Sequence, residues 1–279
     1  IEEVNNGQSL TYFEALTSAF FYGCKKYKKN IVIAEFGLFG RGDAVNILKK
    51  NLCNIVTSCS EDHLDWLPKD ERTIERIIYE KTSSLLNSNI IVAKQTSEKI
   101  TECIKKNIFN NNANKFFFNE DYNFVLKEND FFYYEDKYGG LKIPKPTMNG
   151  QFQLENASTA IATLRILENL KIKDQQIIDG IKKANNTARL EEIKSGKLKN
   201  LAKNNILILD SSHNPGGSKV LNDYLQTLEC KKHVIIGMMA NKDHREYISY
   251  FKNISSLTTV DIPNQKNAIS GIELKEKFK

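Results

Sequence analysis

Helical spacing and short β-branched runs alternate along the first part of the chain. Apolar residues recur at helical spacing in LTYFEALTSAFFYG, which ends on glycine, so a helix is predicted over residues 10–23. The runs IVIA (31–34), NIVT (54–57) and NIIVA (89–93) predict buried strands. A helical segment at 70–86 separates the second run from the third. Strand, helix and strand in this rhythm predict a parallel sheet, and therefore the α/β class.

The pattern changes in the second part of the chain. Aromatic-rich alternation over 115–143 predicts short antiparallel strands beside the parallel sheet, and helices are predicted at 151–170 and 174–183. The segment NNTARLEE then indicates a crossing between domains. After it, the strands NNILIL and HVIIG, a helix that begins near Pro215 and the run LTTVDIP predict a second α/β unit.

Length and composition are those of an ordinary globular protein. The chain has 279 residues, of which 41% are hydrophobic and 27% charged. Because one domain has about 150 residues, we predict domains at 1–186 and 187–279. The net charge of +6 is spread along the chain, and KKYKK at 25–29 fits a solvated helix end better than a nucleic-acid or membrane contact. We therefore expect no nucleic-acid partner and no membrane partner.

Cysteine usage and hydropathy favour the cytoplasm. The five cysteines are an odd number without a CxxC pair, which is typical of free thiols in a reducing compartment. No apolar run approaches the ~18 residues that a membrane helix needs, and the segment IEEVNNG is acidic where a secretion signal is basic. We expect a cytoplasmic protein.

Polar segments follow four of the predicted strands. They are EFGLFGRGDAVN (35–46, hereafter the glycine-rich loop), SCSEDH (58–63), DSSHNPGG (210–217) and MMANKDH (238–244). Ligands of parallel α/β sheets bind outside the carboxyl ends of the strands, where loops and helix N-termini meet. These four segments are therefore the candidate site.

The first two segments allow two interpretations each. Glu35 is followed by Gly37, Gly40 and Gly42, so it is either a metal-binding carboxylate in a loop that approaches phosphate or the capping acid of a glycine-rich turn. The GxxGxG spacing differs from the GxGxxG of dinucleotide-binding loops. His63 either shares a divalent ion with Glu35 or is a hydrogen-bonded bystander.

The other candidates differ in strength. By its spacing, Lys81 is one more surface lysine of its helix. Asp210 and His213 lie on a glycine-punctuated turn just past a strand, where a nucleotide ribose or phosphate would lie and a helix N-terminus stabilises anions.

Eight segments in one order carry a family resemblance. They are LTYFEALTSAFFY, EFGLFGRGDAVN, TSCSEDHLDWL, YEKTSS, GQFQLENA, TARLE, DSSHNP and GMMANKD. In that order they resemble the folate-site helix and the motifs EVGLGGRxDATN, ITSIGxDHxxxLG, EKAGI, GxHQxxNA, GRLE, DGAHNP and GxxxDKD of the folylpolyglutamate synthase and dihydrofolate synthase family. This family is a branch of the Mur ligase superfamily. Each motif is weak alone, but eight in one order over essentially the whole chain are specific.

The resemblance implies a fold and a reaction. The implied fold is a Mur-ligase-like ATP-binding domain on a parallel sheet, followed by a smaller Rossmann-like α/β domain. In the implied reaction, a carboxylate of dihydropteroate or of a folate's terminal glutamate attacks the γ-phosphate of ATP, and the amino group of L-glutamate displaces phosphate from the acyl phosphate. Such phosphoryl transfer needs charge neutralisation and positioning. The implied partners are ATP, two Mg²⁺ ions, a pterin or folate and glutamate, and the implied assembly is a monomer.

The resemblance also implies roles for individual residues. Glu35 and His63 correspond to Mg²⁺ ligands, and Lys81 to a lysine whose carbamylation makes an anion able to hold a second Mg²⁺. Lys81 and His213 are the implied catalytic residues. The implied ATP contacts are Asn156, Arg189 and Asp210, with His213 beside them, and the implied contacts to the pterin and carboxylate end of the acceptor are Phe13, Arg41 and Asp43.

The sequence departs from the family pattern in ways that leave alternatives open. No G-x-x-x-x-G-K-[ST] occurs among the 14 glycines, and the family's phosphate-binding loop GTNGKGS has no counterpart. We therefore expect a fragment that lacks this loop and the C-terminal end and is inactive alone. Phe39 stands where the motif has glycine and is expected to narrow the acceptor pocket. The alternatives are a Mur-type cell-wall amino-acid ligase, which should lack TYFEALT and GLFGRGD, and a catalytically dead folate- or nucleotide-binding relative.

Overall fold

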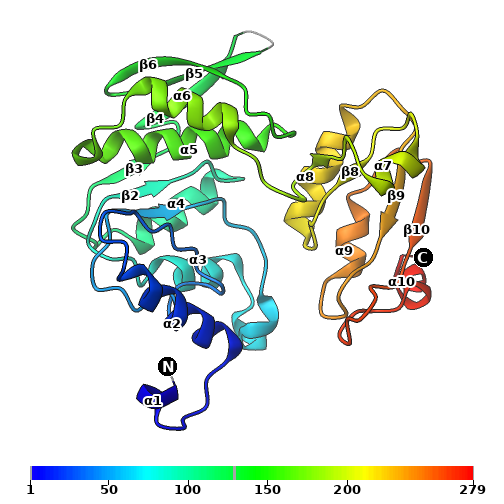
Figure 1. Ribbon diagram of the computed structural model, residues 1–279, viewed down its shortest axis with the longest axis horizontal. Coiled ribbons are helices and arrows are strands. Elements are labelled where there is room, and N and C mark those ends of the chain that lie inside the picture. The colour runs from blue at the N-terminus through cyan, green and yellow to red at the C-terminus, as the bar shows by residue number, and fades with distance from the viewer. Residues whose placement is uncertain (1, 128–129, 279) are drawn as a thin grey trace. The chain divides into compact units, whose positions relative to one another are not determined.

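The computed structural model describes residues 2–127 and 130–278 (Figure 1). The chain divides into two compact units, Ile1–Phe116 (unit 1) and Phe117–Lys279 (unit 2), and each is described by itself. The domain boundary predicted between residues 186 and 187 stays a prediction.

Unit 1 contains a small parallel sheet. β1 (Asn54–Val56) pairs in parallel with β2 (Ile90–Val92), with Asn54 opposite Ile90. β3 (Lys115–Phe117) is third in the order β1-β2-β3. All three residues of β2 are buried, as is usual for a strand of a parallel sheet that is covered on both faces. The predicted parallel sheet and α/β class are confirmed.

The N-terminal helices of unit 1 are α1 (Glu2–Asn5) and α2 (Tyr12–Cys24). α2 begins at a capping box, in which the Thr11 hydroxyl accepts from the backbone N–H of Glu14 and the Glu14 carboxylate accepts from the backbone N–H of Thr11. The helix continues through Gly23, the predicted stop, and ends one residue later.

The other two helices of unit 1 also begin at hydroxyl caps. α3 (Ile74–Thr82) starts after Thr73 and is shorter than the predicted helix, because the residues before the cap form the 3₁₀ turn η2 (Lys69–Glu71). α4 (Glu98–Asn107) starts after Ser97 and is absent from the sequence prediction, although its cap and apolar stripe are both visible in the sequence.

The segment IVIA (31–34) is not a strand, and its prediction was wrong. The segment is irregular, and its β-branched side chains are exposed, Ile33 by 90%. Within residues 2–127 and 130–278, no backbone hydrogen bond joins it to another segment. A strand is stabilised by the ladder to its neighbour and by packing of its side chains, and this segment has neither. β-branched composition alone does not supply a pairing partner.

Unit 2 contains an antiparallel meander, as the aromatic alternation predicts, except that the predicted strand at 115–117 is β3 of the β1-β2-β3 sheet and not part of the meander. β4 (Tyr122–Leu126), β5 (Phe131–Asp136) and β6 (Gly139–Pro144) pair in the order β4-β5-β6. α5 (Phe152–Ile166) and α6 (Asp174–Lys183) lie along one face of this sheet (Figure 1). α5 is shorter than predicted, because a 3₁₀ turn, η3 (Glu168–Leu170), follows it.

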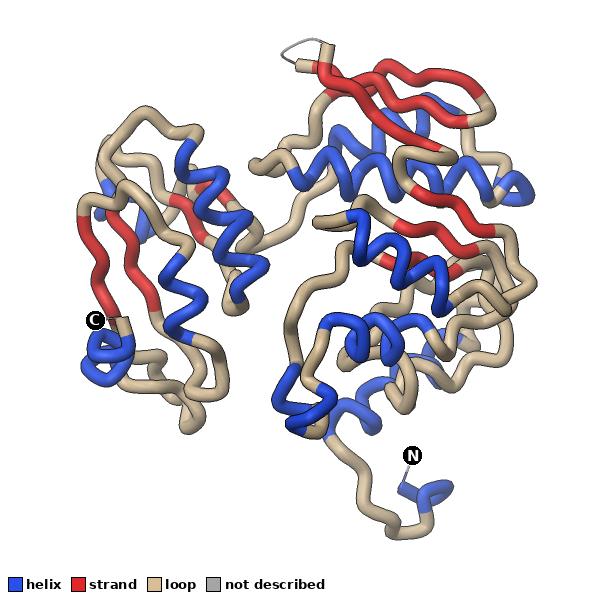
Figure 2. The backbone as a smooth tube through the Cα atoms, turned by 180° about the vertical axis from the view of Figure 1, so that it is seen from behind, coloured by secondary structure: helices blue, strands red, loops and turns tan. Residues whose placement is uncertain are grey.

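Figure 2 shows the strands of the meander beside the helices that cover them. Aromatic packing and one ion pair hold the meander to α5. Phe132, Tyr134 and Ile143 are completely buried. Arg165 of α5 pairs with Asp136 at 3.1 Å and donates to two carbonyl oxygens of the β5–β6 turn. Both charged side chains are nearly buried, so each depends on the other for compensation of its charge.

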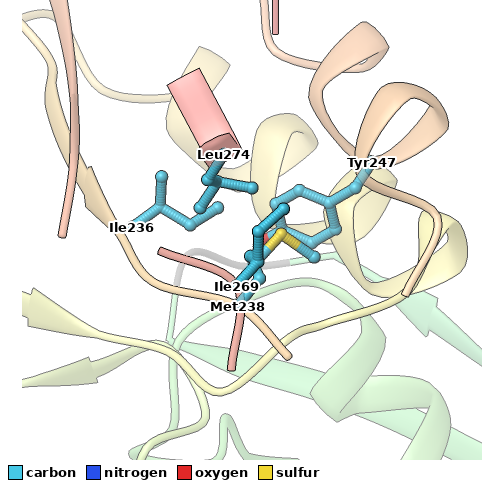
Figure 3. Close-up of a cluster of buried hydrophobic side chains, with 5 residues drawn as sticks. All are labelled: Ile236, Met238, Tyr247, Ile269 and Leu274. Carbon is cyan, nitrogen blue, oxygen red and sulfur yellow. The ribbon is translucent and has the colours of Figure 1, made fainter. Parts of the chain in front are cut away.

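The rest of unit 2 alternates short strands and helices. The elements are β7 (Glu191–Glu192), α7 (Lys197–Ala202), β8 (Ile208–Leu209), α8 (Pro215–Gln226), β9 (His233–Ile236), α9 (His244–Ser249), β10 (Ser256–Thr259) and α10 (Gly271–Lys277). β9 and β10 pair in parallel, whereas β7 and β8 are antiparallel. Their core consists of Ile236, Met238, Tyr247, Ile269 and Leu274, which converge in Figure 3. The predicted second α/β unit is present.

The apolar run NNILIL forms a shorter and more exposed strand than predicted. Two of its residues, Ile208 and Leu209, form the ladder with β7, and Leu207 accepts one further backbone hydrogen bond from Ile193. Leu209 is 46% exposed. The helices α7 and α9 are absent from the sequence prediction. All five cysteines are free, as predicted. None of the helices in the described ranges combines the length and the apolar character needed to cross a bilayer.

Candidate functional site

The glycine-rich loop is shaped by one of its own acids. Asp43 accepts hydrogen bonds from the backbone N–H of Leu38 at 2.7 Å and from that of Val45 at 2.8 Å. The Asn46 side chain donates to the carbonyl oxygen of Gly40 at 3.0 Å. Both carboxylate oxygens of Asp43, which is predicted to contact the acceptor, are therefore used to close the loop.

The glycine-rich loop lies against the C-terminal end of α3. The backbone N–H of Arg41 donates to the carbonyl oxygen of Glu80 at 3.0 Å. A Cβ atom on Gly40 would lie 3.2 Å from the carbonyl oxygen of Lys81 and 3.3 Å from that of Glu80. Glycine at this position thus allows the two backbones to approach closely.

A buried carboxylate joins the loop to α3. The Glu80 side chain is only 6% exposed and accepts from Nε (2.9 Å) and Nη2 (2.7 Å) of Arg41. Arg76, one helical turn earlier, reaches the same Oε1 atom at 2.7 Å. Both guanidinium groups lie over the ring of Tyr79. The hydrogen bonds from Arg41 lower the pKa of Glu80 against the opposing effect of burial, so the carboxylate is charged.

His63 contacts the glycine-rich loop through Phe39. The two rings meet edge to face, with centroids 6.0 Å apart and planes at 80°. Both residues have a φ of 58°, in the left-handed region that non-glycine residues rarely adopt. Phe39 is buried with Leu67 and Ile77 in one core cluster, and this packing offsets the cost of its backbone conformation. The narrowing of the acceptor pocket by Phe39 stays a prediction.

The turn after β1 continues directly into a 3₁₀ turn. The backbone N–H of His63 donates to the Asp62 carboxylate at 2.8 Å. The 3₁₀ turn η1 (Leu64–Trp66) begins at the next residue and leaves Trp66 67% exposed. The turn therefore presents the imidazole and the indole close together in the chain.

Lys81 belongs to the last turn of α3. It is half-buried and forms no ion pair within residues 2–127 and 130–278. Cys59, three residues after β1, is 1% exposed. Burial raises the pKa of the Cys59 thiol, while the positive charge of Lys81 lowers it.

In unit 1 the glycine-rich loop thus contacts both the turn after β1 and the end of α3. These three segments carry Glu35, His63 and Lys81, the predicted metal ligands. Glu35 is exposed and forms no hydrogen bond or ion pair within the described ranges. Phe13 of α2 covers the same loop, since a Cβ atom on Gly37 would lie 2.7 Å from its ring. The described residues contain no group of three or more His, Cys, Asp or Glu side chains able to hold a metal ion.

In unit 2, Asp210 holds a turn that exposes Arg189. Its carboxylate accepts from the backbone N–H of Leu190 at 2.9 Å and from that of Ser212 at 2.8 Å. Arg189 lies between two residues of positive φ, Ala188 at 56° and Leu190 at 50°. The Arg189 side chain is exposed, so the strained turn presents a cation to solvent.

Relief of strain in this turn should stabilise the protein. Ala188→Gly is expected to raise the free energy of unfolding by about 0.5–1 kcal/mol, because the left-handed conformation costs alanine more than it costs glycine. Both backbone hydrogen bonds of residue 188, to the Glu191 carboxylate and from Ser211, remain possible. Urea denaturation measures the change.

The matched control is Ala184→Gly at the end of α6. The φ of Ala184 is −59°, so the same substitution there gains no relief and should lower the free energy of unfolding by about 0.5–1 kcal/mol. Equal destabilisation by both variants would contradict the assignment of strain to Ala188.

The segment DSSHNPGG forms the start of α8. Asn214 caps the helix by accepting from the backbone N–H of Gly217 at 2.8 Å, and Pro215 is the first helical residue. Gly217 leaves no room for a side chain, since its Cβ atom would lie 2.8 Å from Cβ of Ser212. Nδ1 of His213 donates to the carbonyl oxygen of Ser211 at 3.0 Å, and the ring is exposed. Asp210 and His213 therefore lie at the helix N-terminus, as predicted.

Asn156 and Tyr247 lie on helices of the same unit. Asn156, a predicted ATP contact, is exposed on α5 and has one long hydrogen bond, to Gln153 at 3.4 Å. The hydroxyl of Tyr247 hydrogen-bonds to Ser212 at 3.0 Å, and Ser218 donates to the Tyr247 carbonyl oxygen. Tyr247 and Glu80 are absent from the sequence prediction. Arg76 four residues before Glu80 is a sequence signal for the latter, whereas no local signal marks the partner of Ser212.

Comparisons with known proteins show what the chain is similar to. No protein-family model matches the chain. The Escherichia coli dihydrofolate synthase/folylpolyglutamate synthase is 28% identical over 264 residues, covering 91% of this chain and 56% of that protein. The structure of E. coli FolC in complex with DHPP and ADP matches with a TM-score of 0.84 and 26% identity, over 99% of this chain and 63% of that one.

The chain is similar over most of its length to dihydrofolate synthase/folylpolyglutamate synthases. The bifunctional folylpolyglutamate synthase/dihydrofolate synthase of Yersinia pestis, complexed with AMPPNP and a Mn ion, matches with a TM-score of 0.82 and 25% identity, over 99% of this chain and 63% of that one. The folylpolyglutamate synthase resemblance and the Mur-ligase-like α/β fold predicted from the sequence are confirmed. The chain spans between about half and two thirds of the length of these synthases.

Proposed function

We propose that the protein is an ATP-dependent ligase that adds L-glutamate to dihydropteroate, to tetrahydrofolate and its polyglutamates, or to both. One observation carries the proposal: in a chain similar to the dihydrofolate synthase/folylpolyglutamate synthases, the loop that carries Glu35 contacts both the turn that carries His63 and the helix end that carries Lys81. A reducing cytoplasm is the proposed location and a monomer the proposed assembly.

The proposed metal ligands of unit 1 fit a divalent cation if the amine of Lys81 is carbamylated. One carboxylate and one imidazole are too few for Mg²⁺, which prefers six oxygen-rich ligands. Carbamylation of the Lys81 amine by CO₂ would add oxygen donors and remove a positive charge, and nucleotide phosphate and water would supply the others. Two Mg²⁺ ions would neutralise the charge that develops during phosphoryl transfer. Glu35 is free to turn toward such an ion, because no other group in the described ranges engages it.

The residues proposed to contact nucleotide in unit 2 retain polar groups that are available to bind a ligand. Each carboxylate oxygen of Asp210 accepts one backbone hydrogen bond and retains a lone pair for a ribose hydroxyl. The exposed guanidinium of Arg189 can pair with phosphate, and the exposed amide of Asn156 can donate to the nucleotide. Nε2 of His213 faces no protein partner within the described ranges and can donate or accept a proton.

The proposed acceptor site involves the glycine-rich loop. Phe13, which covers Gly37, can stack against a pterin ring. Asp43 and Arg41 have protein partners already, so we propose that they shape the loop against which the acceptor binds. In the proposed reaction the acceptor carboxylate oxygen attacks the γ-phosphorus with loss of ADP, and the glutamate nitrogen then attacks the acyl carbon with loss of phosphate.

The deciding experiment follows ADP release. Protein produced from the complete reading frame is incubated with ATP, Mg²⁺, glutamate and either dihydropteroate or tetrahydrofolate. ADP release that requires both glutamate and a pterin acceptor is the expected result. Release with a muramyl peptide acceptor would make the protein a cell-wall amino-acid ligase. Nucleotide or folate binding without any turnover would make it a binding relative.

A further inference from the structure

We propose that Arg41 is a positioning residue that, through Glu80, holds the glycine-rich loop on the last turn of α3 and so fixes Lys81 relative to Glu35. The inference rests on the proposed function for the roles of Lys81 and Glu35. It gives Arg41 a role different from the acceptor contact that the sequence resemblance implies.

Three independent contacts meet at the same two residues of α3. The Arg41 side chain makes two hydrogen bonds to the Glu80 carboxylate, at 2.9 and 2.7 Å. The Arg41 backbone N–H donates to the Glu80 carbonyl oxygen, and Gly40 approaches the carbonyl oxygens of Glu80 and Lys81. A two-point guanidinium–carboxylate pair sets orientation as well as distance. The loop therefore cannot slide along α3 without breaking all three contacts.

Glu80 serves as an anchor and not as a ligand. Its side chain is almost fully buried, and both oxygens accept from guanidinium groups, so no face is open to a metal ion or substrate. Lys81 follows it by about 100° around the helix axis. Its amine is half-buried and has no ion pair within residues 2–127 and 130–278. Glu80 thus holds the loop, while the adjacent Lys81 presents a reactive amine.

The glycine-rich loop makes a second contact, with His63. Phe39, two residues before Arg41, packs edge to face against the imidazole. The glycine-rich loop is therefore joined to the end of α3 by charge and to the turn after β1 by an aromatic contact. Loss of the Arg41–Glu80 pair should therefore make the positions of the loop, the end of α3 and the turn after β1 less fixed relative to one another.

Arg76 provides a matched control for Arg41. Both guanidinium groups reach Oε1 of Glu80 at 2.7 Å, and both lie over Tyr79. They differ in that Arg76 belongs to α3 itself, where it also pairs with Glu71 at 3.0 Å, and cannot join the loop to the helix. Loss of Arg41 leaves Glu80 paired with Arg76, so the buried carboxylate keeps a cation in either variant.

The test compares Arg41→Ala, Arg76→Ala and Arg41→Lys in protein from the complete reading frame. Arg41→Ala should lower kcat about 10- to 100-fold with the KM for the pterin acceptor nearly unchanged. Hydrogen exchange of the amides in the glycine-rich loop should become faster in Arg41→Ala and stay at the parent rate in Arg76→Ala. Arg41→Lys should fall between Arg41→Ala and the parent, because an ammonium group cannot make the two-point pair.

Three results would overturn the proposal. A raised acceptor KM at unchanged kcat would make Arg41 a direct acceptor contact. An equal loss of kcat in Arg76→Ala would mean that the two arginines only support α3. Unchanged amide exchange in Arg41→Ala would show that the loop is held by other contacts. The exchange measurement needs no turnover, so it decides the role of Arg41 even if the parent protein shows no glutamate-dependent ADP release.

Discussion

Glu35→Gln is expected to lower glutamate ligation about 10³-fold or more while changing the free energy of unfolding by less than about 0.5 kcal/mol. The side chain is exposed and has no partner in the described ranges, so the fold loses nothing with its charge. The amide that replaces it keeps the shape but not the anionic oxygen that a hard divalent cation prefers. ADP release with saturating substrates, together with urea denaturation, measures the two effects.

The control for this variant is Glu61→Gln. Glu61 is an exposed acid in the turn after β1, two residues before His63. Removal of its charge alters the local field by a similar amount but removes none of the proposed ligands. Equal losses in both variants would mean that Glu35 acts only through its charge in the general field, and full activity of Glu35→Gln would exclude it from the site.

Lys81→Ala is expected to remove about 10³-fold of the activity and, with it, any dependence on bicarbonate. Carbamylation joins the neutral amine to CO₂ and releases one proton, so the parent protein should lose activity in CO₂-depleted buffer and recover it when bicarbonate is added. Alanine has no nitrogen for this reaction. Initial rates at several bicarbonate concentrations, for parent and variant, provide the measurement.

Lys106→Ala on α4 controls for the loss of a lysine from a helix of the same unit. It should keep both the rate and the bicarbonate response of the parent, because Lys106 is exposed on α4 and belongs to none of the three segments. A parent rate that is indifferent to bicarbonate would leave Lys81 as an ordinary cation and would require another source of oxygen ligands.

Local sequence signals predicted the elements that depend on local chemistry. α6 matches its predicted range, and the apolar runs of β1 and β2 do form parallel strands. The run at 31–34 has the same composition but no ladder partner in the described ranges, so its prediction fails. A strand exists only in relation to a neighbour, and composition reports nothing about the neighbour. The ladder between β7 and β8 likewise depends on both strands and has two residue pairs.

The candidate site, like the fold, could be predicted only in part from the sequence. His63 after β1 and Asp210 after β8 could be named from the sequence as polar residues that follow strands, and so could the family resemblance. Glu35 was named by the same argument, although the segment before it is not a strand. The backbone conformations of Phe39 and His63 could not be predicted, because a positive φ in these residues is imposed by packing between segments that are distant in the chain. Glu80 was overlooked for a related reason: its partner Arg41 is 39 residues away, and helical spacing reveals only Arg76.

The exposed indole of η1 has a practical consequence. Trp66 is the single tryptophan of the 279 residues and lies three positions after His63. Intrinsic fluorescence excited at the red edge of the indole band therefore originates from this one turn. A paramagnetic ion seated beside the imidazole would quench that emission, so a titration could report occupancy of the turn optically, without a label and without turnover.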